Sequence, residues 1–140
     1  MVNADLINAG DFEKITALCK EAMYGMLGFE MAHVGINTEN EEAALKTANR
    51  FSFLFGFQNN PGKPSIYSGP GIEVMKTLYL GRNGHIGIRT NSLLRARAYF
   101  ERQGIEFNQE SERLDENGKV RLVYFKEEIG GFAVHLAQKK

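Results

Sequence analysis

The chain has 140 residues, which suffices for one domain of ordinary size or for two small, similar modules that share a core. Its 17 basic and 17 acidic residues cancel, so no charge excess favours nucleic acid, and no basic amphipathic stretch indicates a membrane surface. No apolar run is long enough to cross a membrane. We therefore expect a small or polar organic ligand. The lone Cys19 excludes an internal disulfide and fits a reducing cytoplasm.

The first 29 residues are expected to be helical. Asp11 follows Gly10 and can cap a helix, and Gly28 is a natural stop for it. We interpret residues 1–29 as a helical lead-in and residues 30–140 as a second domain. Apolar residues recur at three- and four-residue steps between the two signals: Phe12, Ile15, Leu18, Cys19, Ala22, Met23 and Met26.

After residue 29 the hydrophobic period changes from helical to alternating. The stretch "MAHVGIN" is a candidate strand, and Thr38 with Glu41 has the spacing of a capping box. That box would open the helix "EEAALKTANRFSFLF", which Gly56 ends. Two further strands, "PSIYSG" and "GIEVMKT", follow the helix. This pattern predicts one β-α-β-β module, over residues 30 to about 80.

The same organisation then repeats after about fifty residues. "GHIGIRT" is again a strand, Asn91 or Ser92 can cap the helix "LLRARAYFERQ", and Gly104 ends it. Three strands follow, "IEFNQES", "KVRLVYFKE" and "GFAVHLAQ", with Asn117-Gly118 as a hairpin turn. The sequence therefore predicts an α+β fold of doubled β-α-β-β-β modules, the first copy trimmed, which bury their faces together.

Alternation indicates where the three histidines of the chain point. Residues two apart in a strand share a face, so the apolar neighbours of each histidine can pack on the helices. Each histidine then takes the opposite face of its strand, which it shares with glycine or alanine. Glu73 likewise takes the face opposite its apolar neighbours Ile72 and Val74. The residues that share a face are His33 with Gly35, His85 with Gly87 and Arg89, and His135 with Ala133.

Four potential metal ligands thus occupy one kind of position on four strands, two in each module. They are His33, Glu73, His85 and His135. Neutral imidazole and carboxylate suit zinc, nickel, iron or manganese. The alternative for any single histidine is a structural, hydrogen-bonded position on a half-buried strand.

From about residue 30 to 138 the chain resembles the vicinal oxygen chelate superfamily, which includes glyoxalase I, extradiol dioxygenases and the bleomycin-resistance proteins. The stretches "AHVGI", "GIEVM", "NGHIGIRT" and "FAVHL" carry the resemblance. It implies paired β-α-β-β-β modules that form a cup around a divalent metal, with His33, Glu73, His85 and His135 as ligands. Glyoxalase I usually has Glu at the last of these positions, so His135 puts lactoylglutathione chemistry in doubt.

The lead-in carries a second resemblance. "MVNADLINAGDFEKITALCKEA" is similar to the carboxyl-terminal tail of the 2-keto-3-deoxy-6-phosphogluconate (KDPG) and 4-hydroxy-2-oxoglutarate aldolases. This implies that the chain is the carboxyl-terminal part of a longer aldolase-related polypeptide. The Schiff-base lysine and acid/base carboxylate of such an aldolase lie upstream of this tail and are not in the chain. An ordinary amphipathic helix is the alternative interpretation.

The first functional hypothesis is a metal-dependent lyase, isomerase or dioxygenase. Its metal would bind two oxygens of a small anionic substrate, such as a 2-keto acid or a sugar acid. Glu73 is the candidate general base if it can leave the metal. Arg89, on the strand face of His85, could pair with a substrate carboxylate or phosphate, and a solvated strand-end charge is its alternative.

Two other hypotheses need no catalysis. The cup could bind a ligand without metal, with Tyr67, Tyr79, Tyr124 and Phe125 as its aromatic wall. The chain could instead regulate or assemble an aldolase to which it is tethered. In either case we expect a homo-oligomer, most simply a dimer. The sequence leaves open whether the two modules pair within one chain or across such a dimer.

Overall fold

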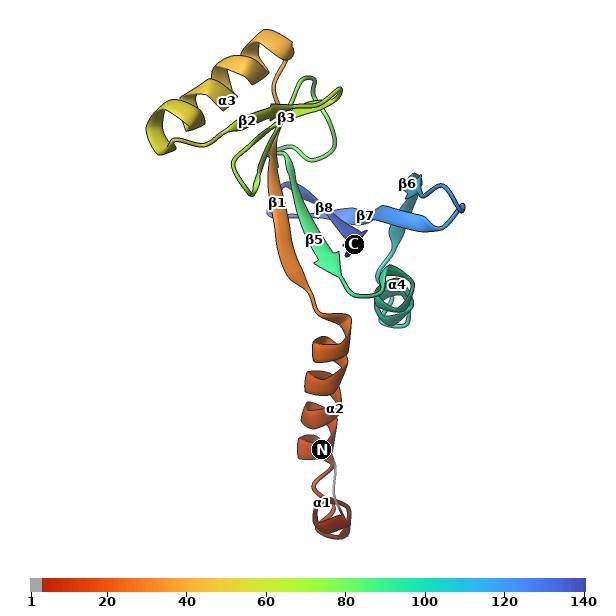
Figure 1. The fold of residues 1–140 in the computed structure, drawn as a ribbon. Coiled ribbons are helices and arrows are strands. Elements are labelled where there is room, and N and C mark those ends of the chain that lie inside the picture. The colour runs from red at the N-terminus through yellow and green to blue at the C-terminus, as the bar shows by residue number, and fades with distance from the viewer. Residues whose placement is uncertain (1–3) are drawn as a thin grey trace.

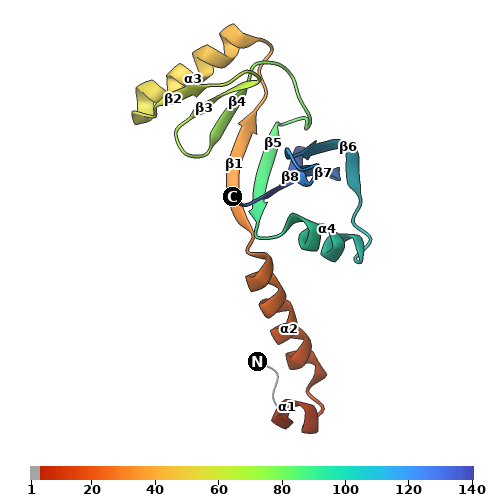
Figure 2. The same cartoon turned by 45° about the vertical axis from the view of Figure 1, so that its right-hand side comes forward.

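The computed structural model describes residues 4–140 (Figures 1 and 2). It confirms the α+β fold of paired modules behind a helical extension, which consists of α1 (Ala4–Asn8) and α2 (Phe12–Leu27). The first module comprises β1 (Glu30–Ile36), α3 (Glu41–Phe55), β2 (Asn59–Pro61), β3 (Ser65–Ser68) and β4 (Ile72–Met75). The second comprises β5 (His85–Thr90), α4 (Leu93–Glu101), β6 (Phe107–Leu114), β7 (Val120–Ile129) and β8 (Phe132–Gln138). No helix among the described residues could span a membrane.

All eight strands belong to one sheet, in the order β2-β3-β4-β1-β5-β8-β7-β6. The order reads the same from either end when each strand is replaced by its counterpart in the other module. Each module pairs its first and last strands in parallel, β1 with β4 and β5 with β8. The modules join where β1 pairs with β5 in antiparallel orientation. In this structure the two modules therefore meet within a single chain.

Each module buries its own small core between its helix and the sheet. In the first, Ala44 and Ala48 of α3 pack on Ile66 and Val74. The small alanines let the helix lie close to the strands. In the second, α4 covers the sheet face through a set that also draws on α2: Leu27, Leu93, Ala96, Phe107, Val123 and Leu136. The strand residues that alternation assigned to the helix side, such as Val74 and Leu136, are indeed those that pack on the helices.

The last turn of α2 is docked on the second module. Leu27 is fully buried in its core, and the carbonyl oxygen of Leu27 accepts hydrogen bonds from the hydroxyl of Thr90 and the backbone amide of Asn91. Gly28 then ends the helix with a positive φ of 57°. The rest of α2 projects away from the sheet (Figures 1 and 2). The extension is thus fixed at one end by core contacts.

Two predicted helix boundaries are wrong. The cap of α3 is Asn40, whose side-chain oxygen accepts from the amide of Ala43, whereas the Thr38 hydroxyl donates to the carbonyl of Met75. Thr38 therefore ties the helix entry to β4. Helix α4 ends at Glu101, before the predicted end at Gly104, and a tight turn leads to Gly104, whose φ is positive. The short strand β2 was not anticipated. Asp11 and Ser92 cap their helices as expected.

We expect Leu27→Ala to lower the free energy of unfolding by about 2–5 kcal/mol, because it leaves a cavity in the second core. Denaturant unfolding measures the change. Leu94→Ala is the matched control: Leu94 is 80% exposed on α4, and its truncation should change stability by less than about 0.5 kcal/mol. Equal effects of the two substitutions would contradict the docking of α2 on the module.

Candidate metal centre

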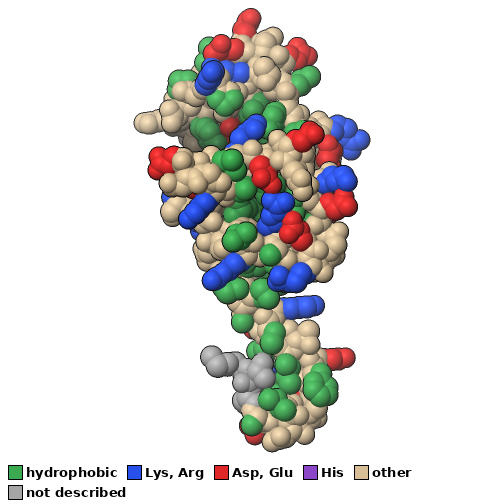
Figure 3. Space-filling view, turned by 90° about the vertical axis from the view of Figure 1, so that its right-hand side faces the viewer, with side chains coloured by type: hydrophobic (Ala, Val, Ile, Leu, Met, Phe, Trp, Pro, Cys, Tyr) green, Lys and Arg blue, Asp and Glu red, His purple; other side chains and the backbone are tan. Residues whose placement is uncertain are grey.

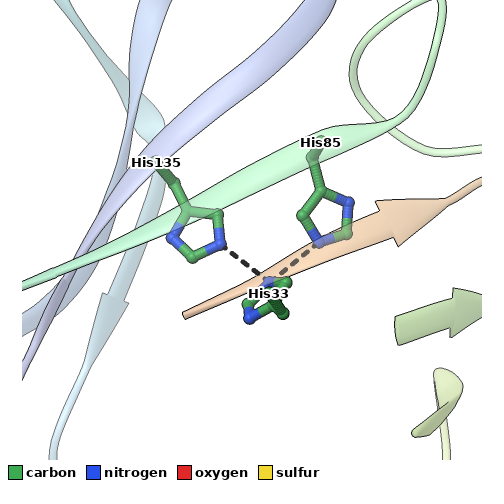
Figure 4. A group of neighbouring side chains, drawn as sticks. All are labelled: His33, His85 and His135. Carbon is green, nitrogen blue, oxygen red and sulfur yellow. Dashed lines mark hydrogen bonds between the residues drawn. The ribbon is translucent and has the colours of Figure 1, made fainter. Parts of the chain in front are cut away.

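The four side chains proposed as ligands come from four adjacent strands. His33 lies on β1, Glu73 on β4, His85 on β5 and His135 on β8, and these strands are neighbours at the centre of the sheet. All four side chains point to the face opposite the helices. Figure 4 shows the three imidazole rings converging from their separate strands. The structure thus brings together residues that are up to about a hundred positions apart in sequence.

The ligand atoms of the cluster meet at short range. Nε2 of His33 lies 3.1 Å from Nε2 of His85 and 3.2 Å from Nε2 of His135. Oε2 of Glu73 lies 3.2 Å from Nε2 of both His33 and His85. A zinc ion that binds nitrogen at about 2.0–2.1 Å holds tetrahedral ligands about 3.3 Å apart. The contacts of 3.1 to 3.2 Å are thus close to the distance between two ligands of one tetrahedral zinc ion.

Hydrogen bonds alone do not account for this packing. Four short contacts join the four atoms, and each would need its own hydrogen directed along the contact. Three neutral imidazoles supply at most one hydrogen each at Nε2, and an ionised carboxylate supplies none. The ligand nitrogens of His33, His85 and His135 all lie within 4.8 Å of one another, so a divalent cation among them would accept their three lone pairs, with Glu73 beside His33 and His85. The donor set therefore fits a metal ion.

Burial keeps the imidazoles of His33 and His135 in the neutral form that binds metal. Burial, reinforced by the neighbouring His33 and His85, lowers the pKa of His135 to about 3. Burial also lowers the pKa of His33, although the charge of Glu73 opposes the shift. At neutral pH both rings are uncharged and their Nε2 lone pairs are free for a cation.

Glu73 is held as an anion beside the histidines. Burial alone would raise the pKa of its carboxyl group, but hydrogen bonds from His85 and Ser65 outweigh burial and lower the pKa to about 2. The Ser65 hydroxyl donates to Oε1 at 2.6 Å, which leaves Oε2 directed at the histidines. Sequence reasoning missed Ser65. Its signal was its position on β3, two residues before Tyr67 and on the same face.

Two glycines provide the space that the imidazoles occupy. A Cβ atom on Gly35 would overlap the ring of His85. A Cβ atom on Gly87 would lie 2.6 Å from Cε1 of His33 and 2.8 Å from Nε2 of His135. Because it has no side chain, each glycine thus leaves room for the imidazole of a histidine in the other module. This explains why the sequence repeats "HVGI" as "HIGI".

Ring orientation in the cluster depends on this packing. The Nδ1 atoms of His85 and His135 are buried and have no hydrogen-bond partner among the described residues. Metal-bound histidines usually donate this N–H to a carboxylate or a carbonyl, which fixes the ring. Here the glycine seats and the surrounding aromatic rings restrict the imidazoles instead.

Three tyrosines surround the histidines. Their ring centroids lie between 4.8 and 6.4 Å from the nearest imidazole. Tyr67 and Tyr79 are partly exposed, whereas Tyr124 is buried, so the first two stand at the rim of the cluster. The pairs are Tyr67 with His33, Tyr79 with His85 and Tyr124 with His135.

The aromatic wall predicted from the sequence is thus present in three of its four positions. Phe125 lies on the other face of the sheet, where its ring stacks on Phe107 at 4.7 Å. Burial raises the pKa of Tyr67 and Tyr124, so both are neutral phenols. Arg89 is exposed on β5, and its positive charge contributes to lowering the pKa of His33. Arg89 therefore acts electrostatically on the cluster from the solvent side.

Comparison with solved structures identifies the fold. Methylmalonyl-CoA epimerase from Mycobacterium tuberculosis aligns with 82% of this chain and 90% of its own, at 15% identity and a TM-score of 0.57. A single-residue variant of the Streptomyces coelicolor epimerase, in complex with 2-nitronate-propionyl-CoA, aligns with 78% and 96%, at 12% identity and 0.55. A hypothetical protein from Bacillus halodurans C-125 aligns with 80% and 95%, at 14% identity and 0.57. The fold is glyoxalase-like.

The paired-module fold expected from the sequence is therefore also the fold of these solved structures. No family model and no curated protein matches the sequence. At this level of identity the likeness establishes the glyoxalase-like architecture.

Gly35→Ala should weaken metal binding by about tenfold or more, because the added methyl group displaces His85 from the cluster. Titration with zinc in the presence of a competing chelator measures the change. Gly71→Ala is the control, since a Cβ atom there meets only the carbonyl oxygen of Ala32 at 4.0 Å. Unchanged zinc affinity in Gly35→Ala would show that the glycine seat does not position His85.

The metal-free protein should lose stability as pH falls from 6.5 to 4.5. The pKa of His135 is about 3 in the folded chain against 6.5 for an unperturbed histidine, so below pH 6.5 the unfolded chain binds a proton that folded His135 does not. The expected slope is at most about 1.4 kcal/mol per pH unit for this residue. Urea unfolding across this range measures it, with His135→Gln as the comparison. A flat profile in the wild type would contradict a depressed pKa.

Proposed function

We propose that the chain is a metal-dependent, glyoxalase-like domain that acts on a small anionic substrate with two neighbouring oxygens, such as a 2-keto acid or a sugar acid. The convergence of three imidazoles and one carboxylate at the centre of the sheet is the observation that carries the proposal. His33, Glu73, His85 and His135 would hold zinc, nickel, manganese or iron. When bound, the ion supplies Lewis-acid stabilisation of charge that develops on substrate oxygens.

The residues around the cluster suit an anionic ligand. Three of the four ligands are neutral, so a bound divalent ion keeps net positive charge beside Glu73. Tyr67 and Tyr79 at the rim offer phenol hydroxyls as neutral donors, and Arg89 adds a positive charge from the solvent side. We assign Arg89 to binding of the substrate carboxylate or phosphate.

Glu73 has one role that its contacts favour and one that they oppose. A carboxylate with a pKa of about 2 remains an anion at any physiological pH, which suits a metal ligand. The same value makes it a weak proton acceptor. Catalysis by Glu73 as a general base requires release of the hydrogen bonds from Ser65 and His85, which would raise its pKa.

The solved neighbours indicate which reactions to test first. They include methylmalonyl-CoA epimerases, and one was solved with a nitronate ligand, which carries an anionic pair of oxygens. Proton transfer at a carbon next to a carbonyl is therefore the first reaction class to test, ahead of carbon–carbon cleavage or dioxygen chemistry. We assign the domain to the cytoplasm, where the exposed free thiol of Cys19 would stay reduced.

The alternative is a metal-free binding or regulatory module attached to an aldolase. Its support is the three-tyrosine wall together with the resemblance of the lead-in to the tail of KDPG and 4-hydroxy-2-oxoglutarate aldolases. Because Leu27 is part of the second core, an upstream aldolase domain would be joined through a rigid helix. Metal content separates this alternative from the enzyme.

Wild-type chain purified without chelators or a His-tag should contain about one divalent ion, and His85→Ala/His135→Ala should contain none. Mass spectrometry of the metals measures both, and circular dichroism checks the fold of the variant. Arg89→Ala is the matched control: it should keep the metal and raise the KM for anionic substrates by about tenfold. If the wild type takes up no zinc, nickel, manganese or iron, the proposal of a metal-dependent enzyme is wrong and the metal-free binding module is favoured.

A further inference from the structure

The choice of metal at the histidine cluster depends on atoms inside the cluster. Figure 3 shows acidic and basic side chains interspersed over one face of the molecule. Surface charges of this kind act alike on every divalent ion. A preference among zinc, nickel, manganese and iron therefore has to come from the type, number and geometry of the ligand atoms.

Glu73 is the ligand whose contribution can vary. Each imidazole offers one nitrogen to the cluster, whereas a carboxylate can bind a cation through one oxygen or through two. The two oxygens of Glu73 have different partners. Oε2 lies 3.2 Å from Nε2 of both His33 and His85, and Oε1 accepts a hydrogen bond from the hydroxyl of Ser65 at 2.6 Å. Glu73 is thus arranged to offer a single oxygen to the cluster.

Ser65 is held in place by the strand that carries it. It lies on β3 opposite Met75 of β4, and Tyr67, on the same face of β3, lies opposite Glu73 itself. The phenol of Tyr67 also donates to the carboxylate, from a side chain that is 37% exposed, whereas Ser65 is 2% exposed. Water can take the place of the exposed phenol, but the buried hydroxyl has no such substitute. Ser65 is therefore the fixed partner of Oε1.

We propose that Ser65 is a positioning residue that limits Glu73 to one metal-binding oxygen and thereby favours zinc over manganese at this site. The inference rests on the metal centre of the proposed function and adds a determinant of metal choice to it. With one oxygen from Glu73, the cluster offers three nitrogens and one oxygen, a four-coordinate set that suits zinc. A second oxygen would bring the set closer to the six-coordinate, oxygen-rich shells that suit manganese.

Competition titrations of the full chain with zinc and with manganese test the proposal. Ser65→Ala frees Oε1 and should lower the ratio of zinc affinity to manganese affinity by about tenfold. Ser68→Ala is the matched control and should keep the wild-type ratio. Ser68 is buried on the same strand, but its hydroxyl donates to the carbonyl oxygen of Ala48 in α3 at 3.4 Å. Circular dichroism checks that both variants are folded.

Cobalt(II) gives a spectroscopic readout of the number of ligand atoms. Its visible absorption is strong in a four-coordinate shell and weakens when further ligand atoms join. The absorption per bound cobalt should therefore be weaker in Ser65→Ala than in the wild type or in Ser68→Ala. A side chain that only supports the packing of β3 would change stability and leave this absorption unchanged.

A Glu73→Gln background tests whether Ser65 acts through the carboxylate. The amide has one oxygen, so Ser65→Ala should have no further effect on the ratio of zinc to manganese affinity in this background. A further tenfold loss there would overturn the proposal. If the wild type binds zinc and cobalt but Ser65→Ala keeps the wild-type ratio and absorption, the role of Ser65 alone is overturned. If the wild type binds neither ion, the metal centre of the proposed function is overturned together with it.

Discussion

The site depends on the register in which β1 pairs with β5. In that register His33 lies opposite Gly87, and His85 lies opposite Gly35. Each strand therefore supplies both a histidine and the space for the histidine of its partner. A shift of one residue would turn the imidazole of the shifted strand toward the helices and place its apolar side chains on the face of the cluster. The outer strands β4 and β8 place Glu73 and His135 beside the glycines of the two central strands.

Much of this arrangement follows from local sequence pattern. Alternation on a strand has a period of two, so the apolar neighbours of His85 and His135 identify the helix side, and the histidines must face the other way. The repeat of strand, cap, helix and glycine indicates two modules, and equivalent positions in the two modules suggest a shared centre. Composition alone would have suggested only a globular domain.

The remaining features depend on contacts between segments that are distant in sequence. The residues around Gly35 do not predict that it makes room for the ring of His85. That contact follows from the pairing of β1 with β5. Tyr79 reaches the cluster from a loop, which has no periodicity to interpret. Thr38 has the spacing of a cap but is drawn to β4, and Asn40 takes its place. In each case a tertiary contact, and not the local sequence, decides where the side chain lies.

The relation between the modules also bears on how a ligand can lie in the site. Glu73 stands beside Gly35 as His135 stands beside Gly87, so the backbone treats the two positions as equivalent. Their chemistry differs: one end of the centre is negative and the other is neutral. An anionic oxygen is repelled at the Glu73 end and tolerated at the His135 end. A symmetrical backbone thus presents an asymmetric surface, on which a molecule with one charged and one neutral oxygen would have a preferred orientation.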